Sequence, residues 1–404
     1  MQGFQKYLIE DKNTHLEHLE DEIINNGTQG AKTSIEFLKS IKKMLQGGKG
    51  GSNVSVKWDG APAVFAGTNP ENGRFFVGTK SIFNATPKIN YTVSDISRNH
   101  GGALADKLAV ALKYLPSLGI KGVLQGDLLF TDDKKNAVVG GERSIVFTPN
   151  TITYAVPATS ADMYDRIRAA KIGIIFHTSY SGKTMKGLKA SFGASVSGLK
   201  RNKNVFFDDA RYKQAEDPGF SKGEEKRFDA IIRMAEGSAY KAGAFIDKIK
   251  KDQGPLSLGV QLKTFFNTYI RSGTKIGNAK VLANNFEVFF RDRLKKEIDG
   301  KKQEKTKEKY KEILEVGMKI LRPNRQGLYF AIATYITLQT AKSLLLSKLN
   351  QIQSIGSFMR TSTGYKATSP EGYVAINKGN AVKLVDRLVF SQANFNVAKD
   401  WVRG

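Results

Sequence analysis

One lysine, Lys57, stands at the end of a short apolar run in the sequence "VSVKWDG" at residues 54–60. The segment before it, "QGGKGGSN", is rich in glycine, and an acid, Asp59, follows two residues later. A lysine in such a position can be a surface charge, a clamp for a phosphate or, once its amine is deprotonated, a nucleophile. The seven residues alone do not choose among these roles, so the choice depends on other charged residues along the chain.

Four further segments place a charged residue within a β-rich run. Lys80 lies in "VGTKSIF" and Asp127 in "GVLQGDLLF", while Glu371 lies in "SPEGYVAI" and Lys383 in "AVKLVDR". Carboxylates together with phosphate oxygens are ligands that Mg²⁺ prefers, and lysines stabilise charge on phosphates. If the fold brings them to Lys57, these residues predict a site for a triphosphate and its metal ion.

Lys-x-Asp-Gly, followed in order by these segments, resembles the signature of the covalent nucleotidyltransferases. This superfamily comprises the ATP-dependent polynucleotide ligases and the mRNA capping enzymes, and the sequence is most similar to phage-type RNA ligases. The resemblance implies ATP as cofactor, with Mg²⁺ or Mn²⁺, and a lysyl-AMP intermediate on the catalytic lysine. It implies this set of nucleotide-binding residues, of which Asp127 and Glu371 would also bind the metal: Lys57, Asp59, Gly60, Lys80, Asp127, Phe176, Glu371 and Lys383.

Three positions qualify the resemblance. Phe176, in "IGIIFHTSY", would stack on the adenine, but a core strand with one buried phenylalanine explains that segment equally well. Asp127 stands where the family usually has a glutamate, and Val385 stands where it has a second lysine, with Arg387 further on. These departures keep open a basic nucleic-acid-binding protein whose nucleotidyltransferase fold has lost its activity.

The composition favours a polyanionic partner. The chain of 404 residues carries 63 Lys+Arg against 38 Asp+Glu, a formal net charge of +25, and such an excess favours binding to phosphates. The absence of cysteine excludes disulfides and thiolate metal sites. The most apolar segment, 327–349, is interrupted by polar residues, so we expect a helix buried in protein rather than a membrane span. No secretory signal is recognisable, which predicts a cytoplasmic protein (in the host cytoplasm if it is viral).

The elements that must position these residues follow from the periodicity. Residues 13–45 predict two helices that separate at Asn26-Gly27, and residues 208–355 predict a helical block. Short β-rich runs fill 54–180, with helices at 101–115 and 161–171, and a hairpin is predicted within 372–390 with its turn at 377–380. We therefore expect an α+β fold: an N-terminal helical segment (1–50), and a nucleotidyltransferase (ATP-grasp-like ligase) domain with antiparallel sheets (51–205 and 366–404), which a large all-α domain (206–365) interrupts.

The function that follows is an ATP-dependent RNA ligase, which adenylylates a 5′-phosphate end of RNA and seals it to a 3′-hydroxyl. Only 17 residues follow Arg387 (404 − 387 = 17), too few for the OB-fold that DNA ligases and capping enzymes usually carry, so the helical block is expected to face the RNA. An adenylyltransferase acting on another acceptor, a DNA-end ligase and the non-catalytic binding protein remain alternatives. Nothing in the sequence predicts an oligomeric state.

Overall fold

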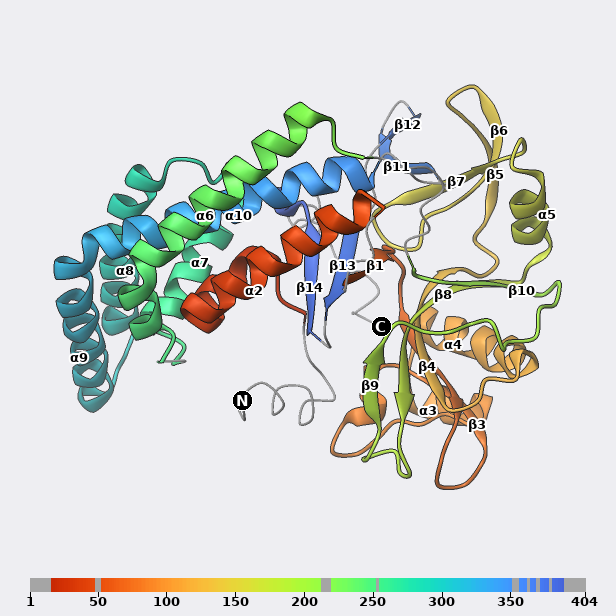
Figure 1. Cartoon of the computed structure of the whole chain (residues 1–404). Helices are drawn as coiled ribbons and strands as arrows, with labels where there is room; N and C mark the ends of the chain where they lie inside the picture. The colour runs from red at the N-terminus through yellow and green to blue at the C-terminus, as the bar shows by residue number, and fades with distance from the viewer. Residues whose placement is uncertain are drawn as a thin grey trace.

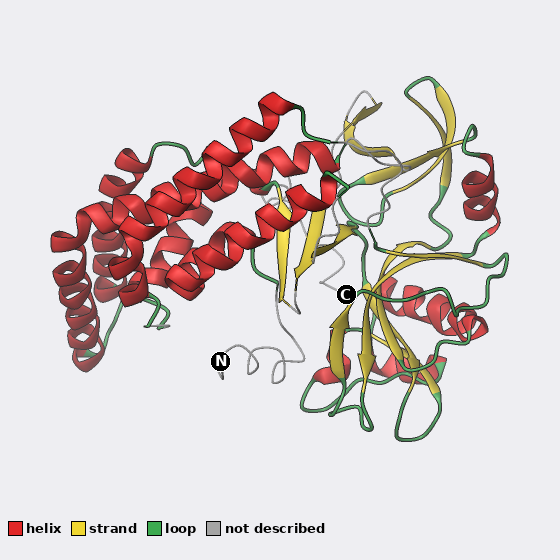
Figure 2. Ribbon diagram, in the orientation of Figure 1, coloured by secondary structure: helices red, strands yellow, loops and turns green. Residues whose placement is uncertain are grey.

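The structure, a computed structural model, describes residues 16–47, 52–211, 219–251, 254–350, 356–361, 364–367, 371–377 and 380–388. Figure 1 shows a helical lobe on one side, two larger β-sheets on the other, and a small sheet between them. Figure 2, coloured by secondary structure, shows that the helical lobe contains no strand among its described residues.

The helical lobe is built from long amphipathic helices around one apolar core. The apolar residues recur every three or four positions, so each helix has one face to bury. Ser221, Ser257 and Asn278 cap three of these helices by accepting hydrogen bonds from backbone N–H groups of the first turn. The elements are η1 (Leu19–Asp21), α2 (Glu22–Leu45), α6 (Lys222–Ile249), α7 (Leu258–Arg271), α8 (Ala279–Asp299), α9 (Glu304–Leu321), η4 (Arg322–Asn324) and α10 (Arg325–Leu349).

The predicted break at Asn26-Gly27 is confirmed as a kink within α2. Gly27 has φ +61° and ψ −139°, a conformation that residues with a side chain rarely adopt. A Cβ at this position would lie 2.2 Å from Asp247 Oδ1 of α6. The Asp247 carboxylate accepts hydrogen bonds from the backbone N–H of Thr28 at 3.0 Å and from its hydroxyl at 2.7 Å. A neighbouring helix thus caps the second half of α2.

The β-lobe holds two sheets with helices packed on them. One sheet has the order β10-β8-β4-β2-β3, with β9 paired to β8, and only the β8–β10 pair in it is parallel. The other sheet has the order β12-β11-β7-β6-β5 and is antiparallel. The strands are β2 (Ala63–Thr68), β3 (Phe75–Gly78), β4 (Val123–Phe130), β5 (Lys135–Val139), β6 (Glu142–Phe147), β7 (Thr153–Pro157), β8 (Ile172–Ser181), β9 (Lys189–Phe192), β10 (Val205–Asp209), β11 (Gly356–Thr361) and β12 (Gly364–Ala367). The lobe's helices are η2 (Lys80–Phe83), α3 (Val93–Asn99), α4 (Gly102–Tyr114), η3 (Leu115–Leu118) and α5 (Ala161–Ala169).

A three-stranded antiparallel sheet joins segments from both ends of the chain. Its order is β1 (Ser52–Lys57), β13 (Gly372–Asn377) and β14 (Asn380–Val385), which confirms the predicted C-terminal hairpin; the turn residues 378–379 lie outside the described residues. One face of this sheet packs on α2, α6 and α10 through Val54, Tyr373, Ala375, Val382 and Leu384. Because side chains alternate along a strand, the residues between these point to the other face.

The mixed α+β fold with mainly antiparallel sheets is confirmed, but the predicted boundaries of the helical domain are wrong. The described helices of this block lie between residues 222 and 349, whereas β11 and parts of β10 and β12 fall within the range 206–365 that was predicted to be all helical. These strands are short and have long-range partners, β10 on β8 and β11 on β7, which a local pattern does not reveal. The N-terminal helix is not a separate unit either, because α2 shares its core with α6 and α10.

Helix α10 is buried in protein, as its polar interruptions predicted. Thr334 and Lys342 are both at most 1% exposed among the apolar residues of this helix. Within the ranges that the structure describes, no helix is long and apolar enough to cross a membrane.

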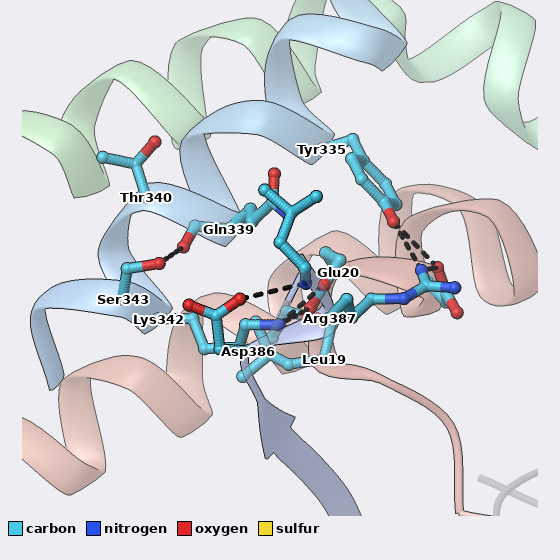
Figure 3. A network of polar contacts seen from close by, with 12 residues as sticks. Leu19, Glu20, Tyr335, Gln339, Thr340, Lys342, Ser343, Asp386 and Arg387 are labelled. Atoms are coloured by element: carbon cyan, nitrogen blue, oxygen red, sulfur yellow. Dashed lines mark hydrogen bonds and ion pairs between the residues drawn. The ribbon is translucent and has the colours of Figure 1, made fainter. Parts of the chain in front are cut away.

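Two buried acids of η1 each pair with a cation that is distant in sequence (Figure 3). Lys342 of α10 donates from Nζ to both carboxylate oxygens of Glu20 at 2.7 Å. Arg387, which follows β14, donates from Nη1 to Asp21 Oδ1 at 3.0 Å. The side chains of both pairs are almost fully excluded from water. These pairs connect the start of the helical lobe, its last helix and the end of the small sheet.

Further hydrogen bonds hold the two terminal nitrogens of Arg387, while its buried Nε has no hydrogen-bond partner among the described residues. Its Nη1 also donates to the hydroxyl of Tyr335 at 2.7 Å, and its Nη2 donates to Asn267 Oδ1 of α7 at 2.5 Å. Burial, the largest influence, lowers the pKa of Arg387, but Asp21, Tyr335 and Glu20 together outweigh it and hold this pKa above its usual value. The guanidinium therefore remains charged in the interior.

The substitution Lys342→Met should destabilise the protein strongly, because it leaves the Glu20 carboxylate buried without its cation. We expect a loss of about 3–5 kcal/mol in the free energy of unfolding, measured by urea denaturation followed by circular dichroism. Lys342→Met combined with Glu20→Leu should recover most of that loss. The control is Lys39→Met, which removes the exposed ion pair with Glu236 and should cost less than about 1 kcal/mol. Equal effects of Lys39→Met and Lys342→Met would contradict the role of burial.

Candidate active site

The fold brings Lys57 and Glu371 into direct contact. The β1–β13 register pairs Lys57 with Gly372, so the residue just before β13 lies beside the end of β1. The Nζ of Lys57 and the carboxylate of Glu371 form an ion pair. Lys57 keeps 27% of its side chain exposed and Glu371 keeps 11%, so the pair is largely buried but not closed off from solvent.

The segment after Lys57 is fixed against β4, which carries Asp127. The N–H of Ala61 donates to Leu128 O at 3.0 Å, and the N–H of Leu128 donates to Pro62 O at 3.1 Å. A Cβ at Gly60 would lie only 2.5 Å from the Asp127 Cβ and 2.9 Å from Leu128 O. Glycine is therefore required at this position for close approach of the loop to the strand. This contact holds Asp127 near Lys57.

Asp59 has a structural role that the sequence did not indicate. Its Oδ1 accepts from Asn150 Nδ2 at 2.7 Å, and its Oδ2 accepts from the backbone N–H and hydroxyl of Thr151 and the N–H of Ile152, each at 2.7 Å. Its own backbone N–H donates to the hydroxyl of Tyr154 at 2.7 Å. The carboxylate is 3% exposed, so it holds the loop before β7 and is not open to a ribose or a metal ion.

Lys383 lies on the same face of the small sheet as Lys57. Its neighbours along β14, Val382 and Leu384, face the helices, so Lys383 faces the opposite side. It pairs with Val374 across β14–β13, and its backbone N–H donates to Glu17 O at 2.9 Å. Arg387 is directed into the helical lobe instead and does not supply the second cation of the site.

The charges around Lys57 determine which groups carry protons. Burial, the largest influence, lowers the pKa of Lys57, but Glu371, Asp127 and Asp59 together outweigh it and raise this pKa above its usual value. Burial and then the charge of Lys57 lower the pKa of Lys383. Burial raises the pKa of Glu371; Lys57 opposes this shift, and Asp59 and Asp127 add to it. In neutral water Lys57 is therefore an ammonium ion held by carboxylates.

Phe176 does not reach this site, and a neighbouring histidine does. Phe176 is fully buried and packs with the apolar residues below α4, so the structure supports the core interpretation and not adenine stacking. His177 is the next residue of β8, and its Nε2 lies 3.7 Å from Asp127 Oδ1. Its Nδ1 lies 2.8 Å from Thr178 Oγ1. Alternation along a strand indicates that neighbours face opposite sides, but only the packing decides which neighbour faces the site.

Lys80 lies at the periphery of the site. It is exposed at the start of η2, just after β3. The order β4-β2-β3 places β3 two strands away from Asp127, which is about 10 Å between backbones. Its side chain is exposed to solvent.

The carboxylates fit a magnesium ion that is shared with a ligand rather than a metal site made by protein alone. Within the described ranges no group of three or more His, Asp or Glu residues is placed to hold a metal ion. Asp59 is fully occupied by protein donors, which leaves Asp127 and Glu371. Mg²⁺ in nucleotide sites is typically held by one or two carboxylates together with phosphate oxygens and water.

The substitution Asp59→Asn tests the structural role of this carboxylate. It places an NH₂ group among four protein donors, and we expect a loss of about 3 kcal/mol in the free energy of unfolding, measured by urea denaturation. The control is Asp133→Asn, an exposed aspartate that accepts one backbone hydrogen bond from Thr131, where the loss should be smaller than about 1 kcal/mol. An Asp59→Asn variant as stable as the wild type would contradict this role.

Residues 13–399 match the sequence model of a family of unknown function, DUF6267, and the chain belongs to this family. No curated protein and no solved structure matches the chain.

Proposed function

We propose that this DUF6267 protein is a covalent nucleotidyltransferase, an ATP-dependent RNA ligase that acts through a lysyl-AMP intermediate. The observation that supports it best is the contact between Lys57 and Glu371, which are 314 residues apart in sequence (371 − 57 = 314), with Asp127 of a third segment close to both. Three separate motifs of the resemblance meet at one amine. A set of unrelated surface charges would not be expected to converge in this way.

In the proposed reaction the deprotonated Nζ of Lys57 attacks the α-phosphorus of ATP. A P–N bond forms, the P–O bond to pyrophosphate breaks, and AMP remains on the lysine. The adenylyl group then passes to a 5′-phosphate of RNA, and a 3′-hydroxyl displaces AMP as the strand is sealed. Positive charge close to the phosphates stabilises the negative charge that develops in these steps, and Lys383 and the peripheral Lys80 supply it.

Asp127 and Glu371 would hold Mg²⁺ or Mn²⁺ with the phosphate oxygens, and the ion would neutralise the triphosphate. The ion pair of Lys57 has a chemical consequence for this scheme. As long as Glu371 faces the ammonium group, the amine keeps its proton and is not a nucleophile. Glu371 would therefore have to turn away from Nζ before Lys57 can react, and the ion pair protects the lysine from reaction while the site has no substrate.

The direct test is incubation with α-³²P-labelled ATP and Mg²⁺, followed by a denaturing gel. Wild-type protein should carry covalent label that survives denaturation and alkali but is released by hot acid, as expected of a P–N bond. Lys57→Ala should carry none, while Lys383→Gln should react about 100-fold more slowly because a cation at the phosphates is lost. The control variant Lys39→Ala removes an exposed lysine of α2 and should react like the wild type. Absence of label on folded wild-type protein with both ATP and GTP would refute the proposal.

A second test concerns the proton on Lys57. Since Glu371 raises the pKa of Lys57, Glu371→Gln should lower it, and the amine should react with a small acylating reagent at lower pH than in the wild type. Peptide mass spectrometry measures the extent of modification of Lys57 against pH, with Glu236→Gln as a control that should leave the profile unchanged. A raised pKa of Lys57 also stabilises the folded protein. This stabilisation is complete at pH values below the pKa of lysine in the unfolded chain, and it is lost as the pH rises through the pKa of Lys57 in the folded protein. An unchanged profile in Glu371→Gln would contradict the electrostatic argument.

A further inference from the structure

Two segments of the β-lobe contain many cations and no acid. Between Asp165 and Asp208 there are nine lysines and arginines but no Asp or Glu, and between Asp106 and Asp127 there are three lysines but no acid. Charged surfaces of proteins normally mix both signs. Arg166 and Arg168 pair with acids that lie just before the first stretch, but the absence of acids within the stretches leaves the other cations without an acid close by in sequence.

The structure brings parts of these two segments together. The backbone N–H of Lys200 donates to Leu118 O of η3 at 3.0 Å, and Asn202 Nδ2 donates to Ser117 Oγ at 3.0 Å. The Lys200 side chain passes within 4 Å of where a Cβ at Gly119 would be. The loop before β10 is thus packed along η3, and its cations lie beside those that flank η3.

We define the η3 basic surface as the five cations of these segments that lie in the loop before β10 or on either side of η3. All five are exposed, and no ion pair is found for any of them among the described residues. Two of them rest on aromatic rings: the Arg201 guanidinium lies 5.5 Å from the ring centroid of Phe207, and Lys113 Nζ lies 5.3 Å from that of Tyr114. The five residues are Lys113, Lys121, Lys200, Arg201 and Lys203.

The helical lobe presents a different distribution of charge. Along α9, Lys307 pairs with Glu304 and Lys311 pairs with Glu308, and on α8 and α10 Glu287 pairs with Arg325. Cations that already have a neighbouring carboxylate gain less from a phosphate, because the acid repels it. The paired cations Lys307, Lys311 and Arg325 are therefore weaker candidates for binding phosphates than the five cations beside η3, which are unpaired among the described residues.

We propose that the η3 basic surface binds the phosphate backbone of a single-stranded nucleic acid, with RNA as the partner. The proposal rests on the proposed function for the identity of the strand, and it assigns a surface separate from the residues around Lys57. Anionic lipid is the less suitable partner, because none of the exposed large hydrophobic residues lies in either segment and surface-bound membrane segments normally insert an apolar face. Phosphate contacts need only positioned cations and little sequence preference.

The test uses the full-length triple variant Lys200→Gln/Arg201→Gln/Lys203→Gln. A fluorescent 5′-phosphorylated single-stranded RNA is titrated with protein, and binding is followed by anisotropy at several salt concentrations. The variant should bind about tenfold more weakly near 0.1 M salt, and the slope of log K against log[salt] should fall in magnitude by about 2, because each neutralised phosphate contributes about 0.7 on single strands. The matched control, Lys301→Gln/Lys307→Gln/Lys311→Gln in the helical lobe, removes three lysines that each pair with a glutamate and should change both quantities much less.

Labelling of Lys57 with ATP alone separates this proposal from the proposed function. The triple variant should form lysyl-AMP like the wild type, which also shows that it is folded. If the wild type binds RNA through this surface but Lys57 takes no label, the surface assignment stands and the ligase proposal fails. If the triple and control variants bind RNA equally well, or if the triple variant loses binding to phosphatidylserine vesicles but not to RNA, the surface assignment is overturned.

Discussion

Burial of the two ion pairs at η1 is the constraint on which the rest of the molecule depends. A buried charge is tolerated only when a partner neutralises it, so Glu20 must meet Lys342 and Asp21 must meet Arg387. These residues come from the beginning of the described chain, from the last helix of the helical lobe and from the end of β14. Satisfying both pairs therefore fixes the small sheet against the helices, although the three segments are far apart in sequence.

The candidate site is a consequence of that arrangement. The Asp21–Arg387 pair fixes the end of β14 against the helices. Antiparallel pairing then positions β13 on β14 and β1 on β13, which places Glu371 beside Lys57. The close approach of Gly60 to Asp127 then connects the small sheet to the β-lobe. The helical lobe thus supports one side of the site from behind, and the six-stranded sheet supplies the other side. A change in how the two lobes pack would alter the geometry around the lysine.

The sequence anticipated some side chains of the site and not others. Lys57, Glu371 and Lys383 were predicted to lie in β-rich segments, and the structure brings these segments together in the small sheet; the hairpin that carries Lys383 was predicted correctly. Phe176 was predicted to face the site, but it is buried in the core and His177 faces the site instead. The alternation of side chains along a strand does not reveal which face is buried. Asp59 was expected at the ligand, but four donors from 150–152 occupy it. Those donors lie some 90 residues away, and no local pattern indicates them.

Local chemistry in the sequence determined the long helices, the break at Gly27, the terminal hairpin and the position of Lys57 at the end of a strand, since periodicity and glycine conformation act over a few residues. The tertiary structure alone decided the partners of each charge. In the folded protein Arg387 pairs with the buried Asp21, Asp59 accepts hydrogen bonds from the loop before β7, and the cations of the η3 basic surface have no neighbouring acid among the described residues. The physical reason is that Coulomb energy and desolvation depend on distance in space and on exposure to water, and a linear sequence specifies neither.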